Sequence, residues 1–383
     1  ESYRIVPQGE GQTFSINART NGVYYTSASI SFLEPWLGGK RPNSLSANIF
    51  FASQTGYSDR YYQAYENLYN NYYYNYNYYG QSDYYQQLQE SEADPDKYLR
   101  TLGVSVGYGK RLSWPDDYFS FYGELSYQLY MLKDWPYMIL TDGNSHNLAL
   151  NLQLSRSSID NPIYTRRGSQ FTLGLKITPP YSLIKGTTDA QYAQMTTSEK
   201  YNLLEYHKWR FSGKVFTPLT QDAKLILMTR AEFGYLGHYN KNAKSPFETF
   251  YMGGDGMSSY SSYSTEYISM RGYQSGSLTP YDPAVGRNMG YVYNKFTMEL
   301  RYPISLEQNA TIWALAFVEA GNCFADIKDY NPFNLKRSAG VGVRLFLPMF
   351  GLMGIDWGWG FDPINGSKQY GGSQFHFVLG QEL

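Results

Sequence analysis

The sequence is short of the residues from which most catalytic and metal sites are built. Cys323 is the single cysteine, which excludes an intrachain disulfide and a zinc site made of cysteines. None of its 4 histidines lies at metal-ligand spacing from another. Phosphate-binding glycine loops and nucleophile elbows are also missing from the sequence. We therefore expect no metal, no cofactor and no enzymatic activity.

Long apolar runs and charges are scarce as well. The longest clean apolar run, Ile312 to Val318, is far shorter than the 18 or more residues of a membrane helix. Glu1–Pro7 is polar and does not resemble a secretion signal. Only 17% of residues are charged and the net charge is −1, so nothing favours nucleic acid as a partner.

Aromatic residues are abundant, and apolar residues recur with a period of two. Aromatics make up 18% of the chain, with 41 tyrosines among them. In "TMELRYPI", Met298, Leu300 and Tyr302 fall on one face, and Glu299 and Arg301 fall on the other. This alternation is typical of a β-strand whose two faces meet different surroundings.

The period predicts fourteen strands, many of ten residues or more. A tilted strand needs about 9–11 residues to cross a bilayer, whereas common soluble strands have about 5–6. The predicted strands cover about 12–20, 23–33, 44–54, 99–112, 118–132, 145–157, 168–179, 202–217, 222–236, 290–302, 309–322, 336–347, 351–360 and 373–383.

Short and long connections alternate between these strands. Short connections such as "SWPDD" and "PLTQD" contain proline, which marks strand ends. Long ones, including 55–98 and 237–289, occupy the other side. This asymmetry predicts an all-β transmembrane antiparallel barrel over residues 1–383, closed because lipid cannot satisfy free backbone groups. The alternative is a soluble sandwich or propeller, which uses shorter strands.

The loop 55–98 contains the low-complexity stretch "YYQAYENLYNNYYYNYNYYGQSDYY". It is too polar for a core and too aromatic for a simple linker. One interpretation is an extracellular loop that touches sugar, protein or a partner subunit on the surface. The other is a long surface loop that packs on its neighbours.

Charged residues on the inner faces are the features that a barrel must explain. With Met298 toward lipid, Glu299 and Arg301 face the lumen, and we place Glu319 of the next strand there too. A plugged lumen favours a cation beside these carboxylates, preferably the fork of an arginine. Arg271 lies in the long glycine-rich loop.

Several motifs resemble the barrel of one known family. They are "FYMGG…ISMRGY" (250–273), "MELRYPI" (298–304), "FVEAG" (317–321), "AGVGVRLFLPMFGLMGIDWGWGFD" (339–362) and the terminal "FHFVLGQEL". The chain is similar along its whole length to the family of outer-membrane protein insertases and two-partner secretion transporters, in a Bacteroidota-like form. The resemblance implies a Gram-negative outer membrane, a sixteen-stranded full barrel and periplasmic POTRA repeats. The first hairpin and these repeats are then expected upstream of residue 1.

The resemblance also implies a loop that folds back into the lumen, here about 237–289. Its motif would hold the loop by an arginine that bonds to acidic residues on the barrel wall. The motif residues are Met270, Arg271, Gly272, Tyr273, Gly253 and Gly254. The implied lumenal partners are Glu299, Glu319 and Arg301.

The implied function is the folding and insertion of outer-membrane barrels, with a client strand templated at a seam between first and last strands. Gly380 interrupts the apolar pattern of the last strand, so we expect residues 373–383 to pair weakly there. Alternatively, Gly380 only accommodates packing. The seam-strand residues are Phe375, Phe377, Leu379 and Gly380.

The implied partners are unfolded outer-membrane protein clients, lipoprotein accessory subunits and the lipid bilayer. Partners on the tyrosine-rich loop are a further possibility. Two alternatives stay open from the sequence: a two-partner protein secretion pore of the same family, and a passive porin.

Overall fold

The structure is a computed structural model that describes residues 11–39, 43–57, 93–135, 138–256, 265–283, 287–307 and 309–380. The chain divides into two compact units. Unit 1 contains Glu1–Gly109, Glu124–Leu150 and Tyr181–Leu204. Unit 2 contains Lys110–Gly123, Asn151–Pro180 and Glu205–Leu383, and it carries all the residues of the candidate site.

All fourteen predicted strands are present, and they form one antiparallel sheet in chain order. The fold class is therefore confirmed as all-β. The strands are β1 Thr13–Asn21, β2 Tyr25–Glu34, β3 Asn43–Tyr57, β4 Ala93–Arg111, β5 Phe119–Lys133, β6 Gly143–Ser157, β7 Gly168–Ile177, β8 His207–Pro218, β9 Ile226–Gly237, β14 Val292–Glu307, β15 Ala310–Phe324, β16 Lys336–Leu347, β17 Gly351–Pro363 and β18 Tyr370–Leu379.

The long connections contain more structure than the sequence predicts. The loop expected over 55–98 is shorter, because β3 runs to Tyr57 and β4 begins at Ala93. The tyrosine-rich stretch between them lies outside the described residues. In the loop 237–289, β10 (Thr249–Met252) pairs in parallel with β11 (Thr265–Ile268). The two-residue strands β12 (Tyr281–Asp282) and β13 (Arg287–Asn288) pair antiparallel there.

Unit 1 includes three short helices in the connection after β7. They are α3 (Tyr181–Lys185), α4 (Asp189–Gln194) and α5 (Thr197–Lys200). Capping boxes begin α4 and α5, where threonine side chains accept hydrogen bonds from backbone N–H groups that have no helical partner. In the described parts of the chain, no helix is long and apolar enough to cross a membrane.

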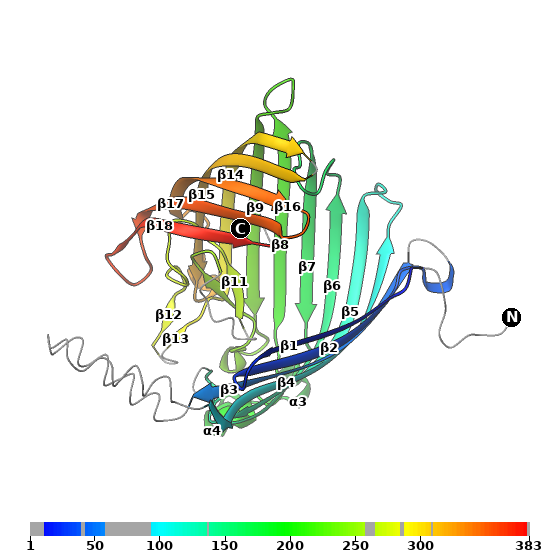
Figure 1. Cartoon of the computed structure of the whole chain (residues 1–383). Coiled ribbons are helices and arrows are strands. Elements are labelled where there is room, and N and C mark those ends of the chain that lie inside the picture. Colours follow the sequence, from blue (N-terminus) through cyan, green and yellow to red (C-terminus); the bar gives the residue numbers. More distant parts are fainter. Residues whose placement is uncertain are drawn as a thin grey trace. The chain divides into compact units, whose positions relative to one another are not determined.

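Unit 2 shows how alternation separates the two faces of the sheet. In Figure 1 its last strands, β14 to β18, run side by side from yellow to red. On β14, Glu299 is 3% exposed, whereas the adjacent Met298 is 47% exposed. Met298 pairs with Val318 of β15, which is also exposed, and Glu299 pairs with the buried Phe317. One face is thus apolar and open, as a lipid-facing surface requires, and the other carries charge.

We expect Val318→Arg to lower the free energy of unfolding in lipid vesicles by about 2–4 kcal/mol, because it places a charge on the apolar face. The measurement is urea unfolding followed by tryptophan fluorescence. Phe333→Arg is the matched control, since Phe333 is 88% exposed in the connection between β15 and β16. Equal effects of both changes would contradict a lipid-facing position for Val318.

Candidate functional site

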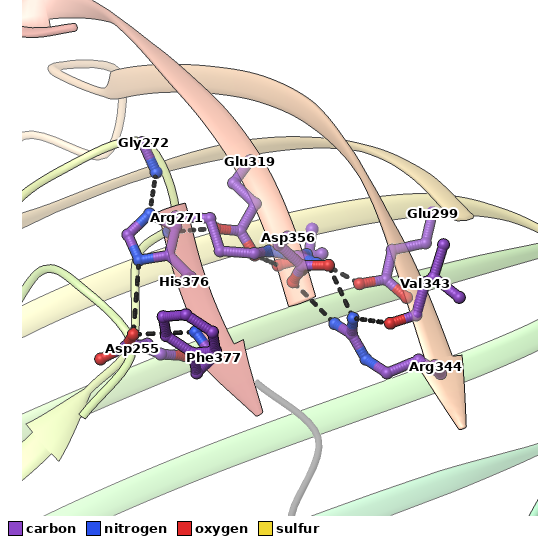
Figure 2. Close-up of polar contacts among 12 residues, drawn as sticks. Asp255, Arg271, Gly272, Glu299, Glu319, Val343, Arg344, Asp356, His376 and Phe377 are labelled. Carbon is purple, nitrogen blue, oxygen red and sulfur yellow. Dashed lines mark hydrogen bonds and ion pairs between the residues drawn. The ribbon is translucent and has the colours of Figure 1, made fainter. Parts of the chain in front are cut away.

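Arg271 lies in the turn after β11, and three carboxylates of the strand wall hold its fully buried guanidinium (Figure 2). Nε and Nη2 donate to Glu319 Oε1 at 3.1 and 2.8 Å. Nη2 also donates to Glu299 Oε1 at 2.7 Å, and Nη1 donates to Asp356 Oδ2 at 3.2 Å. The backbone N–H of Arg271 donates to Glu319 Oε2 at 2.9 Å. Such charge-assisted bonds fix the loop in position and in orientation.

Each of these carboxylates is shared with one cation of the wall itself. Arg301 Nη2 donates to Glu299 Oε2 at 2.7 Å. Arg344 grips Asp356 with both terminal nitrogens, at 2.6 and 2.7 Å. The remaining wall cation, Lys295, lies 3.2 Å from Glu319 Oε1. The wall therefore supplies three carboxylates and three cations, and Arg271 joins them as a fourth cation.

Neighbours of Arg271 complete the attachment. The guanidinium carbon lies 3.6 Å from the ring centroid of Phe317, a cation–π contact. The backbone N–H of Gly272 donates to His376 Nε2 at 2.8 Å. The Tyr273 hydroxyl donates to the Arg337 carbonyl at 2.8 Å. Four consecutive strands, β14 to β17, and the end strand β18 thus hold one short turn.

The turn can approach β17 and β18 closely because the wall there carries glycine. A Cβ on Gly358 would lie 2.8 Å from the backbone nitrogen of Gly272. Cβ atoms on Gly360 and Gly371 would overlap the carbonyl oxygen of Gly272. Gly272 itself has φ +82, and its own Cβ would meet the Gly360 nitrogen at 2.8 Å. The glycines of both partners are required by close approach of two backbones.

The other motif residues shape the segment that presents Arg271. Gly254 and Met270 exchange backbone hydrogen bonds of 3.0 and 2.9 Å. Gly253 and Gly254 have φ +127 and +76, in the region that favours glycine, and Met270 is fully buried. The structure therefore gathers all six motif residues around one turn.

A second set of ion pairs ties the same loop to β7 and β8. Glu248 accepts from Lys176 Nζ at 2.5 Å and from Lys208 Nζ at 3.1 Å. Glu266 of β11 lies 2.8 Å from Lys208 Nζ and 2.8 Å from Arg210 Nη2. Here the loop supplies the carboxylates and the wall supplies the cations, the reverse of the Arg271 cluster.

These lysines control the titration of Glu248, which lies in the connection before β10. Burial raises the pKa of the Glu248 carboxyl, but Lys208 and Lys176 outweigh burial and lower that pKa from 4.5 to about 2. The folded protein therefore holds Glu248 ionised more firmly than the unfolded chain does.

The seam-strand residues lie on β18 and just beyond it. Phe375, Phe377 and Leu379 are exposed on the apolar face. The described strand β18 ends at Leu379, and Gly380 follows it with φ +78. A Cβ there would meet nothing within 4 Å, so packing does not require this glycine. Weak pairing of residues 373–383 with the first strand stays a prediction.

Sequence reasoning missed several members of the site. Asp356 alternates with the exposed Trp357 and Trp359, so period two could have placed it beside Glu299 and Glu319. His376 and Arg344 also alternate with apolar residues and could have been placed in the same way. The sequence gave no such indication for Glu248 and Glu266, because their partners lie on distant strands. Among the described residues, no group of three or more His, Cys, Asp or Glu side chains could hold a metal ion.

An antiparallel barrel sheet with a loop arginine bound to its inner wall defines a class of membrane protein, the β-barrels. Comparison with known families and solved structures identifies the family within that class. The Omp85 superfamily domain matches residues 8–383, so this chain belongs to the Omp85 superfamily.

Two solved structures share the fold. BamA from Haemophilus ducreyi, lacking POTRA domains 1–3, aligns with a TM-score of 0.60 at 16% identity. The alignment covers 96% of this chain and 64% of that one. CdiB from Escherichia coli aligns with a TM-score of 0.53 at 10% identity, over 93% of this chain and 53% of that one. This chain therefore spans less than two thirds of either. BamA and CdiB are outer-membrane proteins. The Bacteroidota-like form stays a prediction.

We expect Gly272→Ala to destabilise the protein more than Gly366→Ala. Both glycines have positive φ, so both changes strain the backbone, but a Cβ on Gly366 would meet nothing within 4 Å. The crowding at Gly272 should add about 1–3 kcal/mol, measured as the difference in free energy of urea unfolding. Equal losses would mean that the turn does not press against Gly360.

We expect Glu248→Gln to lower the free energy of unfolding at neutral pH. Because the pKa of Glu248 is lower in the folded protein, its ionisation stabilises the folded state fully at pH values above the unfolded pKa of 4.5. This contribution is lost as the pH falls toward the folded pKa of about 2. The difference between wild type and variant should therefore shrink over that interval. Unfolding curves at pH 7, 4 and 2.5, with Asp329→Asn as the exposed control, test this; a constant difference would contradict it.

Proposed function

We propose that this chain is the barrel of an insertase that folds β-barrel proteins into the bacterial outer membrane. In this proposal, a client strand pairs with the end strand at a lateral seam, and the loop bearing Arg271 controls the state of that seam. Membership of the Omp85 superfamily supports the general role. The loop attachment at Arg271 supports the specific one.

The charge balance around Arg271 is the observation that carries the proposal. Removing one partner of a buried ion pair commonly costs about 3–5 kcal/mol, because a charge is left without a partner. Here Glu299 keeps Arg301 and Asp356 keeps Arg344 when Arg271 departs. Glu319 keeps Lys295 at 3.2 Å. The attachment is therefore strong in place yet leaves a balanced wall when released, as a reversible latch requires.

A seam has a physical basis in the edge of a sheet. A strand without a neighbour offers a row of free N–H and C=O groups, and a second chain can add to them. The end strand β18 exposes Phe375, Phe377 and Leu379 on the lipid-facing side. A client strand of alternating apolar and polar residues would match that face.

The proposed partners follow from this role. They are unfolded outer-membrane proteins as clients, lipoprotein accessory subunits of an assembly complex, and the surrounding bilayer. Surface partners on the tyrosine-rich loop are also proposed. We assign the chain no catalytic chemistry.

The alternative functions are a two-partner secretion pore and a passive porin. The secretion pore would use the same loop to close a path for an unfolded exoprotein. A porin has no use for a loop that binds both β7–β8 and β14–β17, and these contacts favour a protein whose lumen is normally obstructed.

We expect Arg271→Ala, in cells depleted of the wild-type gene, to reduce the assembly of client barrels much more than the outer-membrane level of the variant itself. Arg337→Ala is the control, because Arg337 pairs with Asp362 in an exposed position where ion pairs contribute little to stability. The readout is heat-modifiable mobility of folded client barrels. Full complementation by Arg271→Ala would refute the latch.

Two further measurements separate the alternatives in the same strains. In planar bilayers we expect weak and erratic conductance; steady open channels from the wild-type protein would favour a porin. Normal client assembly with loss of one secreted exoprotein in the depleted strain would favour the secretion pore.

A further inference from the structure

The backbone of β18 has a donor that points away from its neighbour strand. Gly380 N–H donates to the Leu352 carbonyl at 2.7 Å, across the β17–β18 ladder. In antiparallel pairs, hydrogen-bonded positions alternate along the strand. Three residues earlier, Phe377 pairs with Ile355 in a position that is not hydrogen-bonded. The Phe377 N–H therefore faces the edge of β18 that is opposite β17.

A side-chain acceptor from the inserted loop receives the hydrogen bond of this N–H group. The Phe377 N–H donates to Asp255 Oδ2 at 3.0 Å (Figure 2). Asp255 follows Gly254, whose backbone bonds to Met270 place it beside the Arg271 turn. A side-chain carboxylate thus takes the place that the carbonyl of an adjoining strand would take.

His376 connects this contact to the arginine turn. Its Nε2 accepts the Gly272 N–H at 2.8 Å, so the ring proton lies on Nδ1. Nδ1 faces Asp255 Oδ2 at 3.9 Å, and the backbone N–H of the next residue, Phe377, completes the cap. A shift of the Arg271 turn would therefore disturb the Asp255 contact through one shared side chain.

We propose that Asp255 is a positioning residue that caps the edge of β18 and that an incoming strand must displace. This inference rests on the proposed insertase function. The Phe377 N–H can be satisfied either by the Asp255 carboxylate or by a backbone carbonyl of an added strand, and the two acceptors exclude each other. The cap protects an apolar strand edge from unselective pairing, and release of the loop exposes the edge for a client.

The first test measures the Phe377 amide directly, without any client. Hydrogen exchange is followed by mass spectrometry on the full-length protein in nanodiscs. We expect Asp255→Ala to speed exchange of this amide about tenfold or more, because a charge-assisted bond is lost. Asp255→Asn keeps an uncharged acceptor and should give a smaller increase. Asp329→Ala, an exposed acid on η4 (Ile327–Asp329), should give none.

The second test measures strand capture. The probe is a synthetic peptide of about ten residues, alternating valine and threonine and ending in phenylalanine, with one cysteine. Under oxidising conditions, the peptide cysteine can form a disulfide with the cysteine of the Leu379→Cys variant, which also carries Cys323→Ser to remove the native thiol. We expect Asp255→Ala to raise the rate of disulfide formation severalfold, and Asp255→Asn to raise it less. The displaced bond and the captured strand are then measured at the same edge.

The outcomes separate this inference from the proposed function. Unchanged Phe377 exchange in Asp255→Ala, while the protein assembles clients normally, overturns the cap alone. Faster exchange with unchanged peptide capture also overturns it, because Asp255 would then have only a structural role. A wild-type protein that assembles no clients in cells overturns the proposed function, whatever the exchange result.

Discussion

The buried guanidinium of Arg271 is the group on which the arrangement of unit 2 depends. A charge that is fully removed from solvent is tolerated only with partners on every side. Its partners come from β14, β15 and β17, strands that must therefore keep their register to present three carboxylates at one point. The register of the wall strands and the position of the loop therefore depend on each other.

The two attachments of the loop have opposite polarity, and this makes the loop position unambiguous. At Arg271 the loop brings a cation to carboxylates; at Glu248 and Glu266 it brings carboxylates to lysine and arginine. Exchanging the two ends would place like charges together at both points, which is strongly unfavourable in a poorly solvated space. Such complementarity specifies one docked arrangement more than it adds stability.

The sequence was sufficient for the fold because alternation with a period of two reports the two faces of every strand directly. It also placed Glu299 and Glu319 on inner faces, where a cation is required, and the resemblance of the motifs identified Arg271 as that cation. It could not find Glu248 or Glu266, because their partners on β8 depend on how the loop folds. The same limit hid the contact between Asp255 and Phe377, which joins positions 122 residues apart.

The glycines beneath Gly272 have a consequence for the end of the sheet. Gly358, Gly360 and Gly371 leave one part of the inner surface of β17 and β18 without side chains, so that a second backbone can lie on it. Strand interiors without side chains lose the cross-strand contacts that hold a sheet together. The loop therefore supplies the packing that these two strands lack. When the loop leaves, β17 and β18 lose this packing and become the most flexible strands of the wall. The same three glycines therefore allow the loop to dock and make the strands flexible without it.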